Sequence, residues 1–158
     1  MRIIVISDTH RQQKELIEKL RELDKADLIL HLGDNVEDGE NLAKIFGVET
    51  LIVRGNGDFD PEYPYDRLID VEGRRIFMTH GHRYNARSGF MSLYYKGLEN
   101  QADIVLYGHT HIPVNVNEKG IIIMNPGSPS LPRQIERIET FGLIEINDDI
   151  KTEIINVK

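Results

Sequence analysis

The 158-residue sequence contains no cysteine, which excludes a disulfide framework and any metal site built from thiolates. The same absence fits a reducing compartment, and we expect a cytoplasmic protein. No apolar run approaches the roughly 20 residues that a helix needs to cross a bilayer. The run at residues 2–7 starts too close to Met1 to leave room for a signal peptide. We therefore expect neither a leader nor a membrane partner.

The sequence also lacks an excess of basic residues. It has 19 Lys and Arg against 26 Asp and Glu, so its formal net charge is −7. Nonspecific binding of a duplex depends on clustered cations that release counterions, so duplex nucleic acid is not an expected partner. A nuclease acting on long nucleic acid is disfavoured for the same reason. A small anionic substrate at a locally positive site remains compatible with this balance.

The length suits one domain spanning residues 1–158, because a chain of this size can bury roughly 70% of its unfolded surface. The expected strands cover residues 2–7, 27–32, 49–54, 66–71, 74–80, 103–107, 112–117, 120–125, 141–146 and 151–157. The expected helices cover residues 12–24, 37–46 and 87–100. Alternation of strand and helix predicts a largely parallel first half, and the second half is mixed. This pattern favours an α/β protein with a two-sheet core and helices on the outer faces.

Polar side chains gather where the apolar runs end. The clusters are Asp8-Thr9-His10, Gly33-Asp34, Gly55-Asn56, His80-Gly81-His82 and Gly108-His109-Thr110-His111. In open α/β sheets, ligands bind at the carboxyl ends of strands, so these five clusters are expected to meet. They hold five of the six histidines.

The donor set of these clusters predicts a dinuclear metal site. Carboxylate and amide oxygens with imidazole nitrogens suit Mn²⁺, Fe²⁺, Ni²⁺, Co²⁺ or Zn²⁺. The candidate ligands are Asp8, His10, Asp34, Asn56, His80, His109 and His111. Seven side chains are too many for one ion, but they serve two ions if Asp34 bridges. Two ions about 4 Å apart would lower the pKa of a bridging water and clamp phosphoryl oxygens during in-line attack.

These motifs, in this order, resemble those of the calcineurin-like metallophosphoesterases, specifically their small single-domain prokaryotic phosphodiesterases. The resemblance covers nearly the whole chain, including Asn125-Pro126-Gly127-Ser128. It implies a four-layer α/β/β/α sandwich with two mixed β-sheets. It also implies homodimers or higher homo-oligomers as an alternative to a monomer.

The resemblance implies a distribution of the ligands between two metal ions. Asp8, His10 and His111 would hold the first ion, and Asp34 would bridge. Asn56, His80 and His109 would hold the second ion. We expect two divalent ions per chain, Mn²⁺ or Ni²⁺ first, with Zn²⁺ or Fe²⁺ as alternatives.

The chain departs from the larger family at Gly57, where many members carry a histidine that assists the phosphoryl group or the leaving group. His82 is our candidate for contacting the phosphate or the leaving group instead. Asp58 is either a turn carboxylate or a residue that orients a ligand imidazole or amide. The candidate catalytic residues are Asp34, Asn56, His82 and Asp58. Without a good acid, the activity should favour leaving groups that depart as stable anions, and diesters over monoesters.

The expected reaction is direct attack on phosphorus by metal-bound hydroxide, with a small phosphodiester as substrate. The alternative is a non-catalytic, metal-binding interaction scaffold, as in the metallophosphoesterase-like subunit of the eukaryotic retromer coat. Gly57 keeps that alternative open. His31 is interpreted as a histidine of the core or one behind the ligands. Arg11 and Arg54 flank motifs and either attract phosphate or are solvated. The aromatic residues could form a rim on which nucleobases stack, but most of them are expected to pack loops onto the sandwich; they are Tyr63, Tyr65, Tyr84, Tyr94, Tyr95, Phe59 and Phe90.

Overall fold

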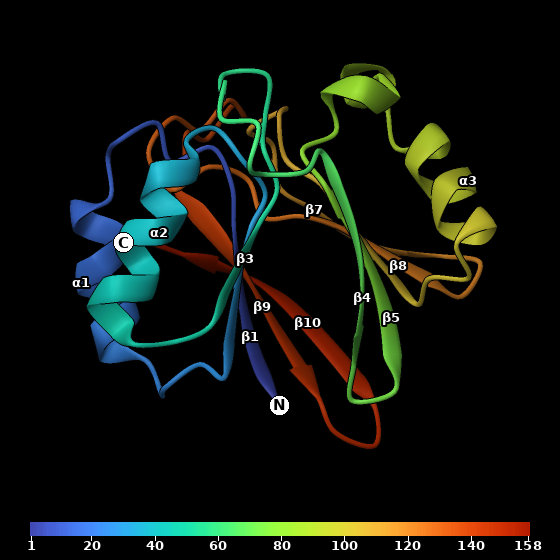
Figure 1. Cartoon of the computed structure of the whole chain (residues 1–158), viewed down its shortest axis with the longest axis horizontal. Helices are drawn as coiled ribbons and strands as arrows, with labels where there is room; N and C mark the ends of the chain where they lie inside the picture. The colour runs from blue at the N-terminus through green and yellow to red at the C-terminus, as the bar shows by residue number, and fades with distance from the viewer.

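The chain folds into four layers, with two β-sheets packed face to face and helices outside each sheet (Figure 1). This computed structural model describes residues 1–158. The helices are α1 (Lys14–Glu22), α2 (Val36–Phe46) and α3 (Met91–Glu99). Two short 3₁₀ turns, η1 (His82–Tyr84) and η2 (Ala86–Ser88), precede α3. In Figure 1, α1 and α2 cover one face of the sandwich and α3 covers the opposite face.

Each sheet contains five strands and mixes parallel with antiparallel pairs. The first sheet has the order β10-β9-β1-β2-β3. Its strands are β1 (Arg2–Ile6), β2 (Leu28–His31), β3 (Thr50–Ile52), β9 (Thr140–Ile146) and β10 (Ile150–Asn156). The second sheet has the order β4-β5-β6-β8-β7. Its strands are β4 (Asp66–Val71), β5 (Arg74–Thr79), β6 (Ile104–Leu106), β7 (Val114–Glu118) and β8 (Ile121–Asn125).

The strand pairing follows the sequence prediction. Strands β1, β2 and β3 are parallel, and β4 with β5 forms the expected antiparallel hairpin. The mixed second half is also confirmed, because β6 is parallel to β5 and β8 whereas β7 and β8 are antiparallel. The two-sheet α/β class predicted from the sequence is therefore correct.

Strand β1 shows why its sequence is apolar throughout. Ile3 and Val5 belong to the core between the two sheets, whereas Ile4 and Ile6 pack with the helices α1 and α2. A strand covered on both faces has no solvent side, so the usual alternation with polar residues disappears. This double burial fixes β1 at the centre of the first sheet and places the residue after it, Ser7, at the same depth.

Two predicted helices are shorter than expected. The stretch 12–24 contains a helix only over Lys14–Glu22. Before it, the Gln13 side chain donates to the backbone oxygen of Asp38 and ties the loop to α2, and after it, Leu23 has an extended backbone. The stretch 87–100 begins as a 3₁₀ turn, and Gly89 with φ of 116° separates it from α3. None of the helices combines the length and the apolar character that crossing a bilayer requires.

Candidate metal centre

The loops that follow β1, β2, β5 and β6 bring five of the seven predicted ligands into two overlapping groups. One contains Asp8, His10 and His111, and the other contains Asp8, Asp34 and His80. Within each group, one ligand atom from every residue lies within 4.8 Å of the others. The structure thus gathers side chains that are as much as 103 positions apart in the sequence. Asp8 is common to both groups.

Asp8 is fully buried and carries one free oxygen. Its Oδ2 accepts hydrogen bonds from Ser7 Oγ at 2.6 Å and from the backbone N–H of His109 at 2.9 Å. Its Oδ1 is buried without a hydrogen-bond partner. Burial alone would raise the pKa of Asp8, but the contact with His111 and the charges of His80 and His111 outweigh it, and the pKa falls to about 2. The carboxylate is therefore ionised at neutral pH, with Oδ1 available as a ligand.

Two histidines each present one free nitrogen to this oxygen. His80 Nδ1 lies 2.7 Å from the backbone oxygen of Leu32, and His111 Nδ1 lies 2.6 Å from that of Leu131. A carbonyl can only accept, so Nδ1 carries a hydrogen in both rings, and Nε2 is the nitrogen left to bind a ligand or a proton. Carbonyl support of the other ring nitrogen is usual for metal-binding histidines.

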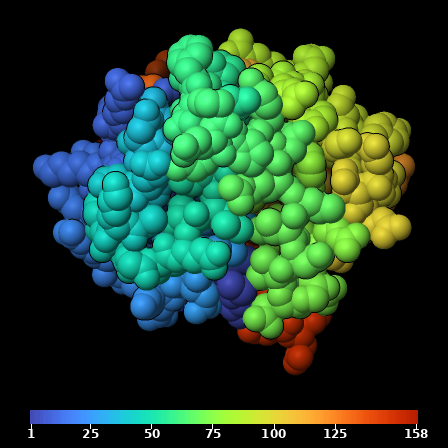
Figure 2. Space-filling model, in the orientation of Figure 1, coloured from blue at the N-terminus to red at the C-terminus, as the bar shows by residue number.

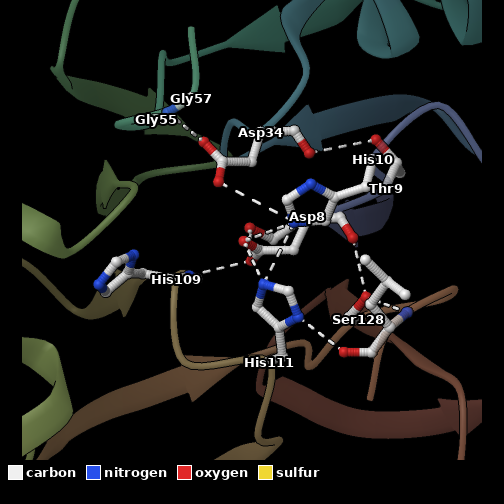
Figure 3. A network of polar contacts seen from close by, with 12 residues as sticks. Asp8, Thr9, His10, Asp34, Gly55, Gly57, His109, His111 and Ser128 are labelled. Carbon is white, nitrogen blue, oxygen red and sulfur yellow. Dashed lines mark hydrogen bonds and ion pairs between the residues drawn. The ribbon is translucent and has the colours of Figure 1, made fainter. Parts of the chain in front are cut away.

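The Nε2 atoms of His10, His80 and His111 converge on Asp8 Oδ1. His111 Nε2 lies 3.1 Å from Asp8 Oδ1 and 3.2 Å from His10 Nε2 (Figure 3). His80 Nε2 is also buried without a partner, 3.8 Å from Asp8 Oδ1. Buried acceptors that face one another repel unless a cation or a proton lies between them. These orphaned atoms, with their mixed O and N chemistry, fit a divalent metal ion.

Asp34 spans the two groups. Its Oδ1 lies 3.6 Å from His80 Nε2, and its Oδ2 lies 4.0 Å from His10 Nε2. The backbone N–H of Gly57 donates to Oδ1 at 2.9 Å (Figure 3). Gly55 must be glycine here, because a β-carbon on it would lie 2.1 Å from Asp34 Oδ1. The glycine before Asn56 in the sequence motif is thus explained by close packing against this carboxylate.

Asp58 holds the loop that carries Asp34. Its Oδ2 accepts from the backbone N–H groups of Asp34 at 2.8 Å and Gly55 at 2.7 Å, and its Oδ1 accepts from Val36 at 3.0 Å. The carboxylate therefore binds three backbone amides, in keeping with the turn carboxylate that was one of the two sequence interpretations, and it contacts neither an imidazole nor a side-chain amide, as the other had expected. It fixes the backbone around Asp34 and the start of α2.

The other candidate side chains lie on a more open side. His109 and His82 are half-buried, and Asn56 is exposed in the loop after β3. The ring of His109 points away from Asp8, His10 and His111 (Figure 3), and its centroid lies 5.2 Å from that of His80. His82 lies 5.4 Å from His80 by the same measure. Burial lowers the pKa of His109 to about 4 and also lowers the pKa of His82, so both rings are neutral at pH 7.

The backbone is left-handed at most of the candidate ligands. The φ angles lie between 46° and 67° at five of them, namely Asp8, His10, Asp34, His109 and His111. Non-glycine residues adopt this region only occasionally, and such conformations cluster at functional sites. The sharp turns let each strand end direct a side chain into the centre.

The Asn125 and Ser128 side chains lock two of the ligand loops together. Ser128 Oγ donates to the backbone oxygen of Asp8 at 2.8 Å, and Asn125 Nδ2 donates to that of Gly108 at 2.9 Å. The sequence reasoning recorded their motif but gave it no role. Ser7, which binds Asp8, was missed, although its position directly before the first ligand was a usable signal.

His31 lies in the core behind the ligand loops, fully buried. Its Nδ1 accepts from the backbone N–H of Gly33 at 3.2 Å, so Nε2–H faces Thr9 Oγ1 at 3.3 Å. Burial lowers its pKa to about 4. The sequence interpretation of His31 as a buried histidine is confirmed, and both ring nitrogens have partners within the protein.

Comparison with known proteins identifies similar chains. A family model described as the calcineurin-like phosphoesterase superfamily domain matches residues 1–149. The protein named probable metallophosphoesterase YsnB from Bacillus subtilis (strain 168) is 32% identical over 154 residues, covering 96% of this chain and 88% of YsnB.

Solved structures show the same architecture. A conserved uncharacterized protein from Streptococcus pneumoniae TIGR4, described as a predicted phosphoesterase, is 33% identical with a TM-score of 0.82, covering 99% of this chain and 89% of that one. Vps29 from Entamoeba histolytica, crystallised with Zn²⁺, has a TM-score of 0.80 over the full length of both chains at 21% identity. The likeness to Vps29 concerns the fold alone.

Proposed function

Because the chain belongs to the calcineurin-like phosphoesterase superfamily, we propose that it is a metal-dependent phosphodiesterase acting on a small substrate. The observation that carries this proposal is the pair of buried, partnerless atoms Asp8 Oδ1 and His80 Nε2. A protein that kept this site without a cation would bear the full cost of their desolvation.

The residues that would hold the ions follow from the family assignment. Asp8, His10 and His111 would hold one ion, and Asn56, His80 and His109 the other. Asp34, whose two oxygens face His80 and His10, would lie between the ions. We propose Mn²⁺ or Ni²⁺ first, and the zinc complex of Vps29 supports Zn²⁺ as an alternative. Two bound divalent ions would supply Lewis-acid charge that activates water and stabilises the phosphoryl oxygens.

The protein's own groups prepare this site for direct attack by water. Two carboxylates, Asp8 and Asp34, leave a net positive charge against two divalent ions, which favours an anionic phosphoryl group. Ser7 Oγ and Ser128 Oγ both donate to Asp8, through its side chain and its backbone. The serines next to the site are thus occupied as structural donors, and the sequence has no cysteine. A covalent enzyme intermediate is therefore not part of the proposal.

Gly57 supports a preference for diesters. A β-carbon at this position would lie 3.1 Å from Asp34 Oδ1, so a side chain here would emerge beside the candidate metal centre. Glycine leaves that place without a cation or a proton donor. A dianionic monoester should lose more from this absence than a monoanionic diester. His82, on the open side, is the group we assign to the phosphate or the leaving group.

The test is hydrolysis of bis-p-nitrophenyl phosphate against p-nitrophenyl phosphate by metal-stripped protein reconstituted with Mn²⁺, Ni²⁺, Zn²⁺ or Mg²⁺. Asp34→Asn should abolish diester cleavage, whereas the matched surface variant Asp149→Asn should retain it. A monoester turned over faster than the diester would refute the diesterase assignment.

Metal stoichiometry measured on the same samples separates enzyme from scaffold. Diester cleavage with two ions per chain would support the proposed dinuclear enzyme. Two ions bound without turnover of either ester would favour the non-catalytic scaffold of the same fold. Absence of metal binding would contradict both readings.

A further inference from the structure

Two arginines from separate loops meet on one tyrosine beside the candidate metal centre. Arg54 follows β3, Tyr65 precedes β4, and Arg83 lies in η1 after β5. The Cζ atom of Arg54 lies 4.0 Å from the centroid of the Tyr65 ring, and that of Arg83 lies 4.7 Å from it. The two loops lie along the same end of the molecule, as the green and yellow-green segments of Figures 1 and 2 show. We call Arg54, Tyr65 and Arg83 the arginine–tyrosine cluster.

Most donors of this cluster have no protein acceptor. A guanidinium carries five N–H donors. Arg54 uses one of them, on the backbone oxygen of Asp60 at 3.3 Å, and its Nε is buried without a partner. Arg83 makes no hydrogen bond, and about half of its side chain, 54%, is exposed. Planar guanidinium donors in such number match the oxygens of a phosphate or a carboxylate.

The charge near the cluster is only partly balanced. Asp66 Oδ2 lies 4.0 Å from Arg83 and accepts a hydrogen bond from the Tyr84 hydroxyl at 2.7 Å. Asp60 meets Arg54 through its backbone, not its carboxylate. One carboxylate therefore faces two guanidinium groups. The whole chain has a net charge of −7, so the positive charge of this cluster is opposite in sign to that of the protein as a whole.

The cluster adjoins the open side of the metal centre. The ring of Tyr65 lies 5.7 Å from that of His82, centroid to centroid. His82 in turn lies 6.1 Å from His109 and 5.4 Å from His80. A single imidazole thus separates the cluster from two candidate metal ligands. A substrate whose phosphoryl group sits at the metals can reach the cluster with a substituent.

We propose that the arginine–tyrosine cluster binds a second anionic group of the substrate, carried on one of its ester substituents. The natural substrate would then be a phosphodiester with a further phosphate or carboxylate, rather than a diester of two neutral alcohols. This inference rests on the proposed phosphodiesterase function for its substrate class. The binding of the anion itself does not depend on turnover.

The kinetic test uses two substrates that differ by one phosphate. Thymidine 3′-(p-nitrophenyl phosphate) and its 5′-phosphorylated counterpart share the same reacting group. We expect Arg83→Gln to raise KM for the 5′-phosphorylated ester about tenfold, the worth of a charge-assisted hydrogen bond. The KM for bis-p-nitrophenyl phosphate should stay within about twofold. Arg21→Gln, an exposed arginine of α1, is the matched control and should change neither.

A binding measurement removes the dependence on catalysis. Titration calorimetry with Mn²⁺-loaded protein should show thymidine 3′,5′-bisphosphate binding about tenfold tighter than thymidine 3′-phosphate. Arg83→Gln and Arg54→Gln should each reduce this preference, and Arg21→Gln should not. Arg54 is partly buried, so its variant is compared with the wild type by thermal unfolding first.

The outcomes separate the inference from the function on which it rests. A preference for the bisphosphate without any ester hydrolysis would keep the anion site and reject the phosphodiesterase. Diester hydrolysis with equal affinity for the two nucleotides would keep the enzyme and overturn the anion site. Equal losses for Arg83→Gln and Arg21→Gln would also overturn it, because they would indicate a general charge effect.

Discussion

The two sides of the candidate metal centre differ in how firmly the protein holds them. On the buried side, Asp8 and His80 are fully buried and His111 is 2% exposed. Each of these side chains is fixed by a hydrogen bond to a neighbouring group. On the open side, His109 and His82 are half-buried and Asn56 is exposed. The comparison teaches that burial and hydrogen bonds within the fold fix one half of the centre, whereas the other half faces solvent.

The largest effect should come from breaking the buried side. Asp8→Asn removes a buried charge from the carboxylate on which three imidazole nitrogens converge, and we expect kcat/KM to fall at least about 10³-fold. Asn56→Ala, on the open side, should cost only about 10- to 100-fold. Metal content after desalting and kcat/KM for bis-p-nitrophenyl phosphate measure both. Equal losses would show that the two sides do not differ in this way.

The second prediction uses pH to compare a buried with a half-buried histidine in metal-free protein. Burial holds the pKa of His31 at about 4, below its ordinary value of 6.5, so the unfolded chain binds the proton first. Stability should be complete above about pH 6.5 and fall as the pH drops towards 4, by about 3 kcal/mol.

Unfolding by urea at pH 7.5 and at pH 4.5 checks this contribution. His31→Gln should reduce the loss between the two pH values. His109→Gln should reduce it less, because His109 is half-buried and solvent screens its charge. An equal reduction in the two variants would contradict the assignment to burial.

The third prediction concerns the support of the Asp34 loop. Asp58→Asn replaces one acceptor oxygen by an NH₂ group that faces backbone donors. We expect metal affinity to weaken about 10- to 100-fold, as for other groups that orient ligands. Metal titration measures it. Asp60→Asn in the same loop is the control, since the Asp60 carboxylate binds only the exposed N–H of Glu62 and should leave the affinity unchanged.

The smallest effect should come from a neutral support of the buried side. Ser128→Ala removes the 2.8 Å donor to the backbone oxygen of Asp8, which keeps only the longer bond from Ser130 Oγ at 3.4 Å, and it removes the acceptor of the Leu131 N–H. We expect a loss of about 1 kcal/mol in the free energy of unfolding. Ser88→Ala, an exposed hydroxyl, should change it by less than about 0.5 kcal/mol. Thermal unfolding of the two variants side by side makes the comparison, and equal shifts would reject the supporting role.

The sequence predicted the fold well wherever the burial of an element determines its pattern of apolar residues. The unbroken apolar run of β1 records a strand covered on both faces, and the Glu72-Gly73 turn between β4 and β5 was recognised from its residues. Helix ends were less predictable. The early residues 12 and 13 were assigned to a helix, but Gln13 binds Asp38, a partner 25 positions away that no local pattern indicates.

The site shows the same division. Strand-end motifs predicted which side chains would meet, and the structure brings five of the seven expected ligands into shared groups. The hydrogen bonds that hold these ligands in place could not be predicted from the sequence, because they involve backbone atoms. Every residue has a backbone carbonyl, and nearly every residue has a backbone N–H. The residue types therefore do not reveal that Leu32 and Leu131 accept from the ligand histidines or which amides bind Asp58. The roles of individual ligands stay predictions until metals are bound.

The left-handed backbone at Asp8, His10, Asp34, His109 and His111 also bears on how this protein can change over generations. Asparagine and glycine adopt this conformation more readily than other residues, so exchanges to these two disturb the loops least. A lineage that abandoned catalysis could therefore replace its ligands one at a time and keep the sandwich intact. The left-handed turns that bring the ligands together therefore also allow the ligands to be replaced with little destabilisation of the fold.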